Sequence, residues 1–204
     1  MSIDLGTATV TSVSVGPMDN NAYLLCCSGS GEQLLVDAAA EPDRLLELIG
    51  RHPLGAVVTT HRHRDHWEAL GRIVAATGAV TMAGAPDASA LPVPIDRELE
   101  HGDTVAVGDL ELGVIRLTGH TPGGIALSLR DADGRAYLLT GDSLFPGGVG
   151  KTTSPADFTQ LLDDVQGRLF DVFGDDTVVL PGHGAPTTLG AERPSLPEWR
   201  NRGW

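Results

Sequence analysis

Apolar positions along the chain follow two spacings, one typical of strands and one typical of helices. Short apolar or alternating runs, mostly bounded by glycine, proline or aspartate, predict strands. These runs cover residues 7–15, 22–27, 33–37, 56–60, 79–82, 110–117, 125–130, 136–140 and 177–180. Helical spacing predicts helices over residues 42–51, 67–77 and 155–173. Strands interrupted by helices in this way predict an α/β protein.

The third predicted helix has well-marked ends. Ser154 is expected to cap its N-terminus, Pro155 to take the first helical position, and Gly174 to stop it. The alanine- and proline-rich stretch 83–94 is interpreted as a surface connection between two halves of the chain. Because it is short for a linker, we expect two sheets within one domain that spans residues 1–204.

The tail 194–204 contains two of the three tryptophans, Trp199 and Trp204. We expect an extended segment that these two side chains hold against the body of the protein. A tail that lines a pocket or contacts a second subunit is the alternative.

Charge excludes several partners. The chain has 14 basic and 27 acidic residues, a net charge of -13, and Lys151 is its only lysine. Nucleic acid and anionic membranes are therefore not expected as partners. No apolar run reaches the length of about 20 residues that a membrane span needs, and the first residues do not resemble a secretory signal. The only cysteines, Cys26 and Cys27, are neighbours and poorly placed for a disulfide, which favours a cytoplasmic protein.

A histidine-rich segment follows the predicted strand 56–60. It holds His61, His63, Asp65 and His66 within six positions. In an extended backbone His61, His63 and Asp65 would point to one side and His66 to the other. Such a loop can supply ligands to two adjacent metal ions, and imidazole and carboxylate suit zinc, iron or manganese.

Three later segments place further ligand types beside glycine. They are GHTPG with His120, TGDS with Asp142 and PGHG with His183. Each lies where a strand is predicted to end, and glycine lets the backbone turn sharply there. Five of the seven histidines fall in these segments and in the earlier loop. The joint pattern predicts a metal site, although each segment alone favours an ordinary turn.

The segments HRHRDH, GHT, GD and PGHG, in this order, resemble the metallo-β-lactamase-fold hydrolases. The chain is most similar to their glyoxalase II-like thioesterase branch. The resemblance extends from NNAYLL near the start through LLVD and GDSLFPGG to PGHG. It implies an αββα sandwich of two mixed β-sheets flanked by helices.

The resemblance also implies a ligand set for two metal ions, zinc by preference. One ion would be held by His61, His63 and His120, the other by Asp65, His66 and His183, with Asp142 as the bridge. Asp65 and Asp142 would take part in catalysis. A hydroxide between two such ions can attack an acyl carbon, and the chain has no Gly-x-Ser-x-Gly motif for a serine nucleophile.

Other residues near these motifs have two interpretations each. Asp37 would orient the histidine loop or cap an ordinary turn. Trp67 would narrow the substrate pocket or begin a helix as a core residue. Lys151 would bind a carboxylate of a thiol carrier, as a basic residue does in similar proteins, or be solvated. Arg62 and Arg64 are expected at the solvated rim of the site.

The leading functional hypothesis is a metal-dependent thioesterase that acts on S-acyl derivatives of a small thiol. The first alternative is an iron-dependent persulfide dioxygenase of the same fold, which would use His61, His120 and Asp142. A lactonase using Tyr23 or Tyr137 and a non-catalytic metal-binding protein are further alternatives. Antibiotic hydrolysis is not expected, because neither cysteine lies among the ligand motifs. Longer glyoxalase II enzymes have a C-terminal helical domain that helps to bind glutathione, whereas this sequence ends about 20 residues after PGHG, so specificity for glutathione is not expected from the resemblance.

Overall fold

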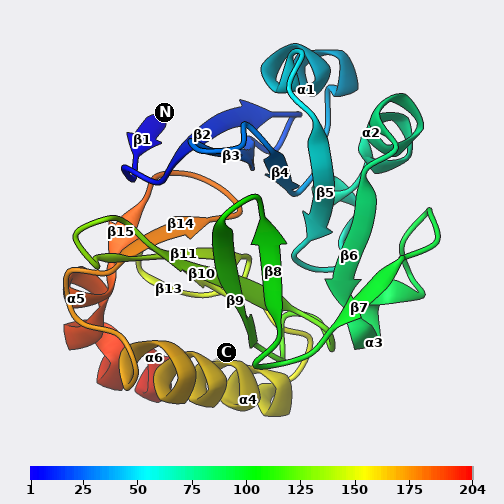
Figure 1. The fold of residues 1–204 in the computed structure, drawn as a ribbon. Coiled ribbons are helices and arrows are strands. Elements are labelled where there is room, and N and C mark those ends of the chain that lie inside the picture. Colours follow the sequence, from blue (N-terminus) through cyan, green and yellow to red (C-terminus); the bar gives the residue numbers. More distant parts are fainter. Residues whose placement is uncertain (204) are drawn as a thin grey trace.

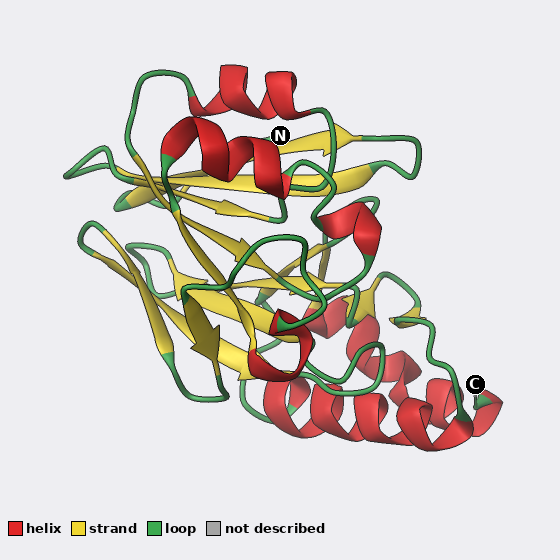
Figure 2. Ribbon diagram, turned by 90° about the vertical axis from the view of Figure 1, so that its right-hand side faces the viewer, coloured by secondary structure: helices red, strands yellow, loops and turns green. Residues whose placement is uncertain are grey.

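The computed structural model describes residues 1–203, and two β-sheets lie face to face at its centre (Figures 1 and 2). The first sheet has the order β1-β2-β3-β4-β5-β6-β7. Its strands are β1 (Ser2–Asp4), β2 (Ala8–Val15), β3 (Asn20–Cys27), β4 (Gln33–Val36), β5 (Leu54–Thr59), β6 (Val80–Gly84) and β7 (Arg97–Leu99). Strands β1 to β4 pair antiparallel, whereas β4 to β7 pair parallel.

The second sheet has the order β15-β14-β11-β10-β9-β8. Its strands are β8 (Thr104–Val107), β9 (Leu110–Arg116), β10 (Ile125–Arg130), β11 (Ala136–Gly141), β14 (Val178–Pro181) and β15 (Thr187–Thr188). Only β11 and β14 pair parallel. A small hairpin of β12 (Leu144–Phe145) and β13 (Gly148–Val149) forms a separate two-stranded sheet.

Helices cover the outer faces of the two sheets (Figure 2). The first sheet carries α1 (Pro42–Ile49) and α2 (Leu70–Thr77), and the second carries α4 (Pro155–Val165) and α6 (Leu196–Arg202), while α3 (Ala85–Ala88) and α5 (Leu189–Glu192) are short. The expected αββα sandwich with two mixed sheets is therefore confirmed. No helix within residues 1–203 combines the length and apolarity needed to cross a membrane.

Three apolar layers hold this arrangement together. The central layer lies between the sheets and includes Leu25, Val58 and Leu127, all fully buried. Two outer layers pack helices onto the sheets, one around Leu70 and one around Trp199. Alternate residues of each strand thus contribute to different layers, as the pleat of a sheet requires.

The predicted strands agree with the observed ones to within two residues at each end. Ser154 caps α4 as expected, because its hydroxyl accepts a hydrogen bond from the backbone N–H of Asp157. The predicted helix 155–173 changes at Gln166 into a wider π-helical turn that ends at Phe170. The predicted helix 67–77 begins only at Leu70.

Two expectations about connecting segments were wrong. The stretch 83–94 does not join the two halves, because β6 and β7 on either side of it pair in the same sheet. It also contains α3, in which Asp87 and Ala88 are buried. The tail is helical rather than extended, although Trp199 is buried as expected; Trp204 lies outside the described residues.

Candidate metal centre

The candidate ligands lie together where strands of both sheets end. His61 follows β5, and Asp142 and His183 follow the parallel neighbours β11 and β14. Backbone hydrogen bonds join these ends, from Gly182 N–H to the carbonyl of Gly141 and from Asn21 N–H to the carbonyl of Gly182. All seven predicted ligand side chains belong to groups whose donor atoms lie within 4.8 Å of one another.

The first group joins His61, His63 and His120. Nε2 of His61 lies 3.1 Å from Nδ1 of His63, which lies 2.9 Å from Nε2 of His120. Three ring nitrogens directed at one point in this way are suited to hold a metal ion.

The second group joins Asp65, His66 and His183. Oδ2 of Asp65 lies 3.5 Å from Nε2 of His66 and 3.4 Å from Nε2 of His183. The two imidazole nitrogens are 3.3 Å apart. Asp65 therefore points with His66 and not with His61 and His63, which corrects the extended-loop expectation. The reason is a 3₁₀ turn over Arg64–His66, which breaks the alternation of an extended segment.

Asp142 lies between the two groups. Its Oδ2 is 3.5 Å from Nε2 of His120 and 3.5 Å from Nε2 of His183, and its Oδ1 is 3.3 Å from Nε2 of His66. Oδ1 is buried and has no hydrogen-bond partner within residues 1–203. A buried carboxylate oxygen without a donor is costly unless a cation compensates it. The residues present therefore fit a pair of metal ions, and Asp142 would be placed to contribute to holding both.

Four of the five histidine rings are fixed through their second nitrogen, Nδ1. The partners are Thr60 Oγ1 for His61 (3.1 Å), Asp37 Oδ2 for His66 (2.7 Å), the Lys151 carbonyl for His120 (2.5 Å) and the Met18 carbonyl for His183 (2.9 Å). Contacts of this kind fix the orientation of metal-binding histidines. Asp37 also accepts hydrogen bonds from the backbone N–H and the hydroxyl of Thr60. Of its two interpretations, these contacts favour a residue that orients the histidine loop over one that caps an ordinary turn.

The electrostatics of the cluster favour a cation. Burial and repulsion from His66 hold the pKa of His61 well below its ordinary value, and burial and His120 lower the pKa of His63. Burial would raise the pKa of Asp142, but the neighbouring His183 and His66 rings hold it well below its usual range. Burial would likewise lower the pKa of His66, yet attraction to Asp37 and Asp142 raises it to about 10. The lowered pKa values leave His61 and His63 unprotonated, as metal ligands must be, while the raised pKa of His66 reflects the attraction of positive charge by the carboxylates around it.

The structure also places the secondary residues. Trp67 is partly buried against the helix-covered side of the first sheet, and its Nε1 donates a hydrogen bond to the carbonyl of Arg62, at 2.8 Å. Arg64 is exposed at the rim, where it pairs with Glu68 at 3.0 Å. Trp67 thus contacts the histidine loop through the Arg62 carbonyl while its ring packs in the apolar layer beneath the helices, in keeping with its interpretation as a core residue.

Sequence reasoning missed Asn20 as a site residue. Its Nδ2 donates a hydrogen bond to Oδ2 of Asp65, at 2.8 Å, and lies 3.4 Å from Nε2 of His183. The only available signal was its position in the NNAYLL motif, whose strand, β3, begins at the site.

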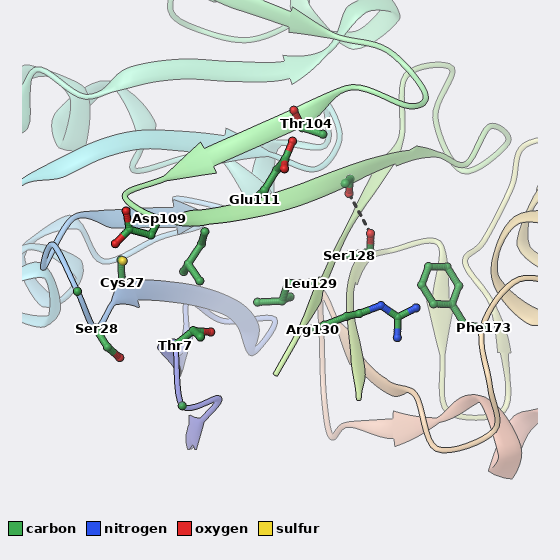
Figure 3. Close-up of a pocket in the computed structure, with 14 residues that line it drawn as sticks. Thr7, Cys27, Ser28, Thr104, Asp109, Glu111, Ser128, Leu129, Arg130 and Phe173 are labelled. Carbon is green, nitrogen blue, oxygen red and sulfur yellow. Dashed lines mark hydrogen bonds between the residues drawn. The ribbon is translucent and has the colours of Figure 1, made fainter. Parts of the chain in front are cut away.

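Two small cavities lie next to candidate ligands, one at Asp65 and one at Lys151, whose carbonyl contacts His120, and a larger groove lies elsewhere. One cavity of about 240 Å³ includes Asp65 and Met18, and one of about 320 Å³ includes Lys151 and Arg202. The groove of about 780 Å³ is lined by residues such as Cys27, Glu111 and Arg130, and none of the three candidate metal groups of residues 1–203 lines it (Figure 3). We therefore assign the chemistry to the metal centre and not to the larger groove.

Gly182 leaves no room for a side chain beside the centre. A Cβ atom there would overlap Oδ1 of Asp142 and lie 2.7 Å from Cε1 of His66. We expect Gly182→Ala to weaken metal binding about 10-fold or more, because displaced ligands typically cost that much affinity. Metal content after dialysis against a weak chelator measures this. Gly167→Ala, where a Cβ meets nothing within 4 Å, is the matched control and should bind like the wild type; equal metal content in both variants would contradict the geometry.

Comparison with known proteins identifies the class. The family model of the metallo-β-lactamase superfamily matches residues 15–183. The chain therefore belongs to this superfamily.

Individual relatives narrow the class. A hydroxyacylglutathione hydrolase of Cereibacter sphaeroides is 37% identical over 170 residues, which are 81% of this chain and 62% of that protein. ETHE1 from Myxococcus xanthus is 29% identical, with a TM-score of 0.79 over 92% of this chain and 83% of that one. The protein TTHA1623, solved in a di-iron-bound form, is 31% identical, with a TM-score of 0.74 over 93% of this chain and 100% of that one. The superfamily match and the hydroxyacylglutathione hydrolase relative, together with the histidine and aspartate groups, indicate a metal-dependent hydrolase.

Proposed function

We propose that this protein is a thioesterase that works with two metal ions. The observation that carries the proposal is the position of Asp142 between two groups of candidate ligands, with a buried oxygen that makes no hydrogen bond among the described residues. The proposed ligands are His61, His63 and His120 for one ion, Asp65, His66 and His183 for the other, and Asp142 for both.

Two adjacent divalent ions held by these residues would supply a nucleophile at neutral pH and polarise the acyl carbonyl. The chain's own residues prepare for this chemistry. Asp142 is ionised, and Asn20 fixes the direction of the Asp65 carboxylate through its hydrogen bond to Oδ2. Asp37 holds the His66 ring from the opposite side, at 2.7 Å. The site thus needs no serine or cysteine nucleophile.

The similarity to hydroxyacylglutathione hydrolases supports a thioester as substrate. The chain spans 62% of the length of the relative from Cereibacter sphaeroides. A small thioester or related ester, with no nucleic acid or membrane partner, agrees with the net charge of -13. The free thiols of Cys26 and Cys27 support a cytoplasmic setting.

The test combines metal analysis with substrate assays. Protein purified without added metal should contain close to two metal ions per chain and should hydrolyse at least one member of a panel of S-acyl thiols. Lactones and oxygen esters in the same panel measure selectivity. A protein that retains two ions yet cleaves only lactones would replace the thioesterase proposal with a lactonase.

The cavity beside His120 suggests how the thiol carrier is bound. It contains Lys151 and Arg202, and within residues 1–203 neither cationic group has a hydrogen bond or ion pair. Two unpaired cations at one cavity of an acidic protein favour a carboxylate on the substrate.

Lys151→Met should therefore raise KM for a carboxylate-bearing thioester about 10-fold, the size of one charge-assisted hydrogen bond. The carbonyl of Lys151 still accepts the hydrogen bond from His120, so kcat should change little. An uncharged thioester should be cleaved as by the wild type. Arg72→Met removes a cation on α2 that pairs with Asp43 and is the matched control; equal effects of the two substitutions would exclude a specific role for Lys151.

The iron-dependent dioxygenase is the second candidate, and the likeness to ETHE1 favours it. The three iron ligands that this enzyme would use, His61, His120 and Asp142, also lie together. Nε2 of His61 is 4.0 Å and Nε2 of His120 is 3.5 Å from Oδ2 of Asp142. Oxygen uptake after addition of a glutathione persulfide distinguishes it from the thioesterase. One iron per chain with oxygen uptake and without thioester hydrolysis would make it the function.

A further inference from the structure

Asp87 is a buried carboxylate that the proposed chemistry does not use. It lies in α3, its exposed fraction is 0%, and both of its oxygens accept hydrogen bonds. Oδ2 accepts from the hydroxyl of Thr121, at 2.6 Å, and from the backbone N–H of Arg62, at 3.1 Å. Oδ1 accepts from the backbone N–H of Gly123, at 3.0 Å.

These donors come from two loops that are far apart in sequence. Arg62 lies between His61 and His63, and Thr121 directly follows His120. Asp87 thus joins the backbone of the histidine loop to the loop of the third ligand of the same group. Asp37, by contrast, contacts the ring of His66 in the other group.

The packing around Asp87 leaves little room for the loops to shift. A Cβ on Gly123 would lie 2.5 Å from the backbone nitrogen of Asp87. A Cβ on Gly84, at the end of β6, would overlap the carbonyl of Gly123. A backbone hydrogen bond of 2.9 Å from Ile125 N–H to the carbonyl of Thr60 joins the same two loops further along.

A carboxylate is suited to this position for a physical reason. Two backbone N–H groups and one hydroxyl point at it, and an acceptor-only group can accept from all three. An amide would present its NH₂ to at least one of these donors. Burial of the charge is tolerated because every donor is directed at it and the Arg62 guanidinium lies 3.8 Å away.

We infer that Asp87 is a positioning residue for one of the two metal ions, the one assigned to His61, His63 and His120. It sets the separation of His63 and His120, whose ring nitrogens lie 2.9 Å apart. The inference rests on the metal centre of the proposed function but not on the identity of the substrate. It deepens that proposal, because the two ions then depend on different supporting carboxylates.

The test measures the two metal affinities separately, by competition between the purified protein and a chromogenic chelator for Zn²⁺ and by the absorption spectrum of Co²⁺ during titration. In Asp87→Asn one of the two affinities should fall about 10–100-fold, as is typical when the partner of a ligand loop is lost, while the other changes little. Asp96→Asn is the matched control. Asp96 also accepts from a backbone N–H and a hydroxyl, both of Thr81 at 2.9 Å, but neither it nor Thr81 adjoins a candidate ligand.

A second pair of variants keeps the test decisive if Asp87→Asn does not fold. Thr121→Val removes only the hydroxyl donor and should weaken the same affinity about 5-fold, the effect of one neutral hydrogen bond. Thr121→Ser retains the donor and should restore wild-type affinity. Metal affinities that are unchanged in folded Asp87→Asn would overturn the inference. If Asp87→Asn does not fold, unchanged affinities in Thr121→Val would overturn it instead. An equal loss of affinity for both ions would also overturn it.

Thioester assays on the wild type separate the two proposals. A wild type that binds two ions but cleaves no thioester would refute the thioesterase while leaving the role of Asp87 in metal binding intact. An active wild type with metal affinities unmoved by the variants would refute the role of Asp87 alone. A wild type that binds no metal ion would refute both.

Discussion

Asp142→Ala is expected to lower kcat/KM for thioester hydrolysis at least about 10³-fold, because it removes the group proposed to hold both ions and with it several kcal/mol of electrostatic stabilisation. The bound metal should fall from about two ions per chain to one or fewer. The structural reason is that the two oxygens of Asp142 reach His66 on one side and His120 on the other, at 3.3 and 3.5 Å. Metal analysis and steady-state kinetics on the same preparation measure both effects.

The neighbouring residue offers a control for this substitution. Ser143 is buried beside Asp142, yet within residues 1–203 its side chain makes no hydrogen bond. Ser143→Ala should therefore retain metal and activity within a few-fold of the wild type. Full activity of Asp142→Ala with two bound ions would show that the carboxylate does not bridge the groups, and the proposed ligand set would have to be abandoned.

The strands and the ligand set could be predicted from the sequence because both are local patterns. The run 125–130 became β10 with unchanged bounds, since alternating apolar residues at the centre of a sheet leave little choice of element. The histidine loop was recognisable because its ligands lie within six positions. Its direction was not, because the 3₁₀ turn at Arg64 depends on backbone hydrogen bonds that no spacing shows.

Asp87 and the tail were misjudged because their environment is made by distant residues. Asp87 stands in an alanine- and proline-rich stretch typical of a surface connection, and it is buried only because the loop of Thr121 and Gly123 folds against it. The tail was expected to be extended, but it forms α6, and Pro197 occupies an early helical position, where proline is tolerated. Tertiary packing thus decided both cases.

Trp199→Ala is expected to destabilise the protein by about 3–5 kcal/mol, the usual cost of removing a large buried aromatic side chain. Trp199 is 2% exposed, and its ring centroid lies 6.3 Å from that of Phe170, in the layer that joins α4 and α6 to the second sheet. For a chain of this size the melting temperature should fall by about 6–20 °C, which thermal unfolding followed by circular dichroism measures.

Trp199→Phe keeps most of the buried area and should lose less stability. Val172→Ala, at a position 66% exposed, should change stability by less than about 0.5 kcal/mol. A loss below about 1 kcal/mol in Trp199→Ala would mean that the tail is not held through this contact, and its alternative role in a pocket or subunit contact would then be favoured.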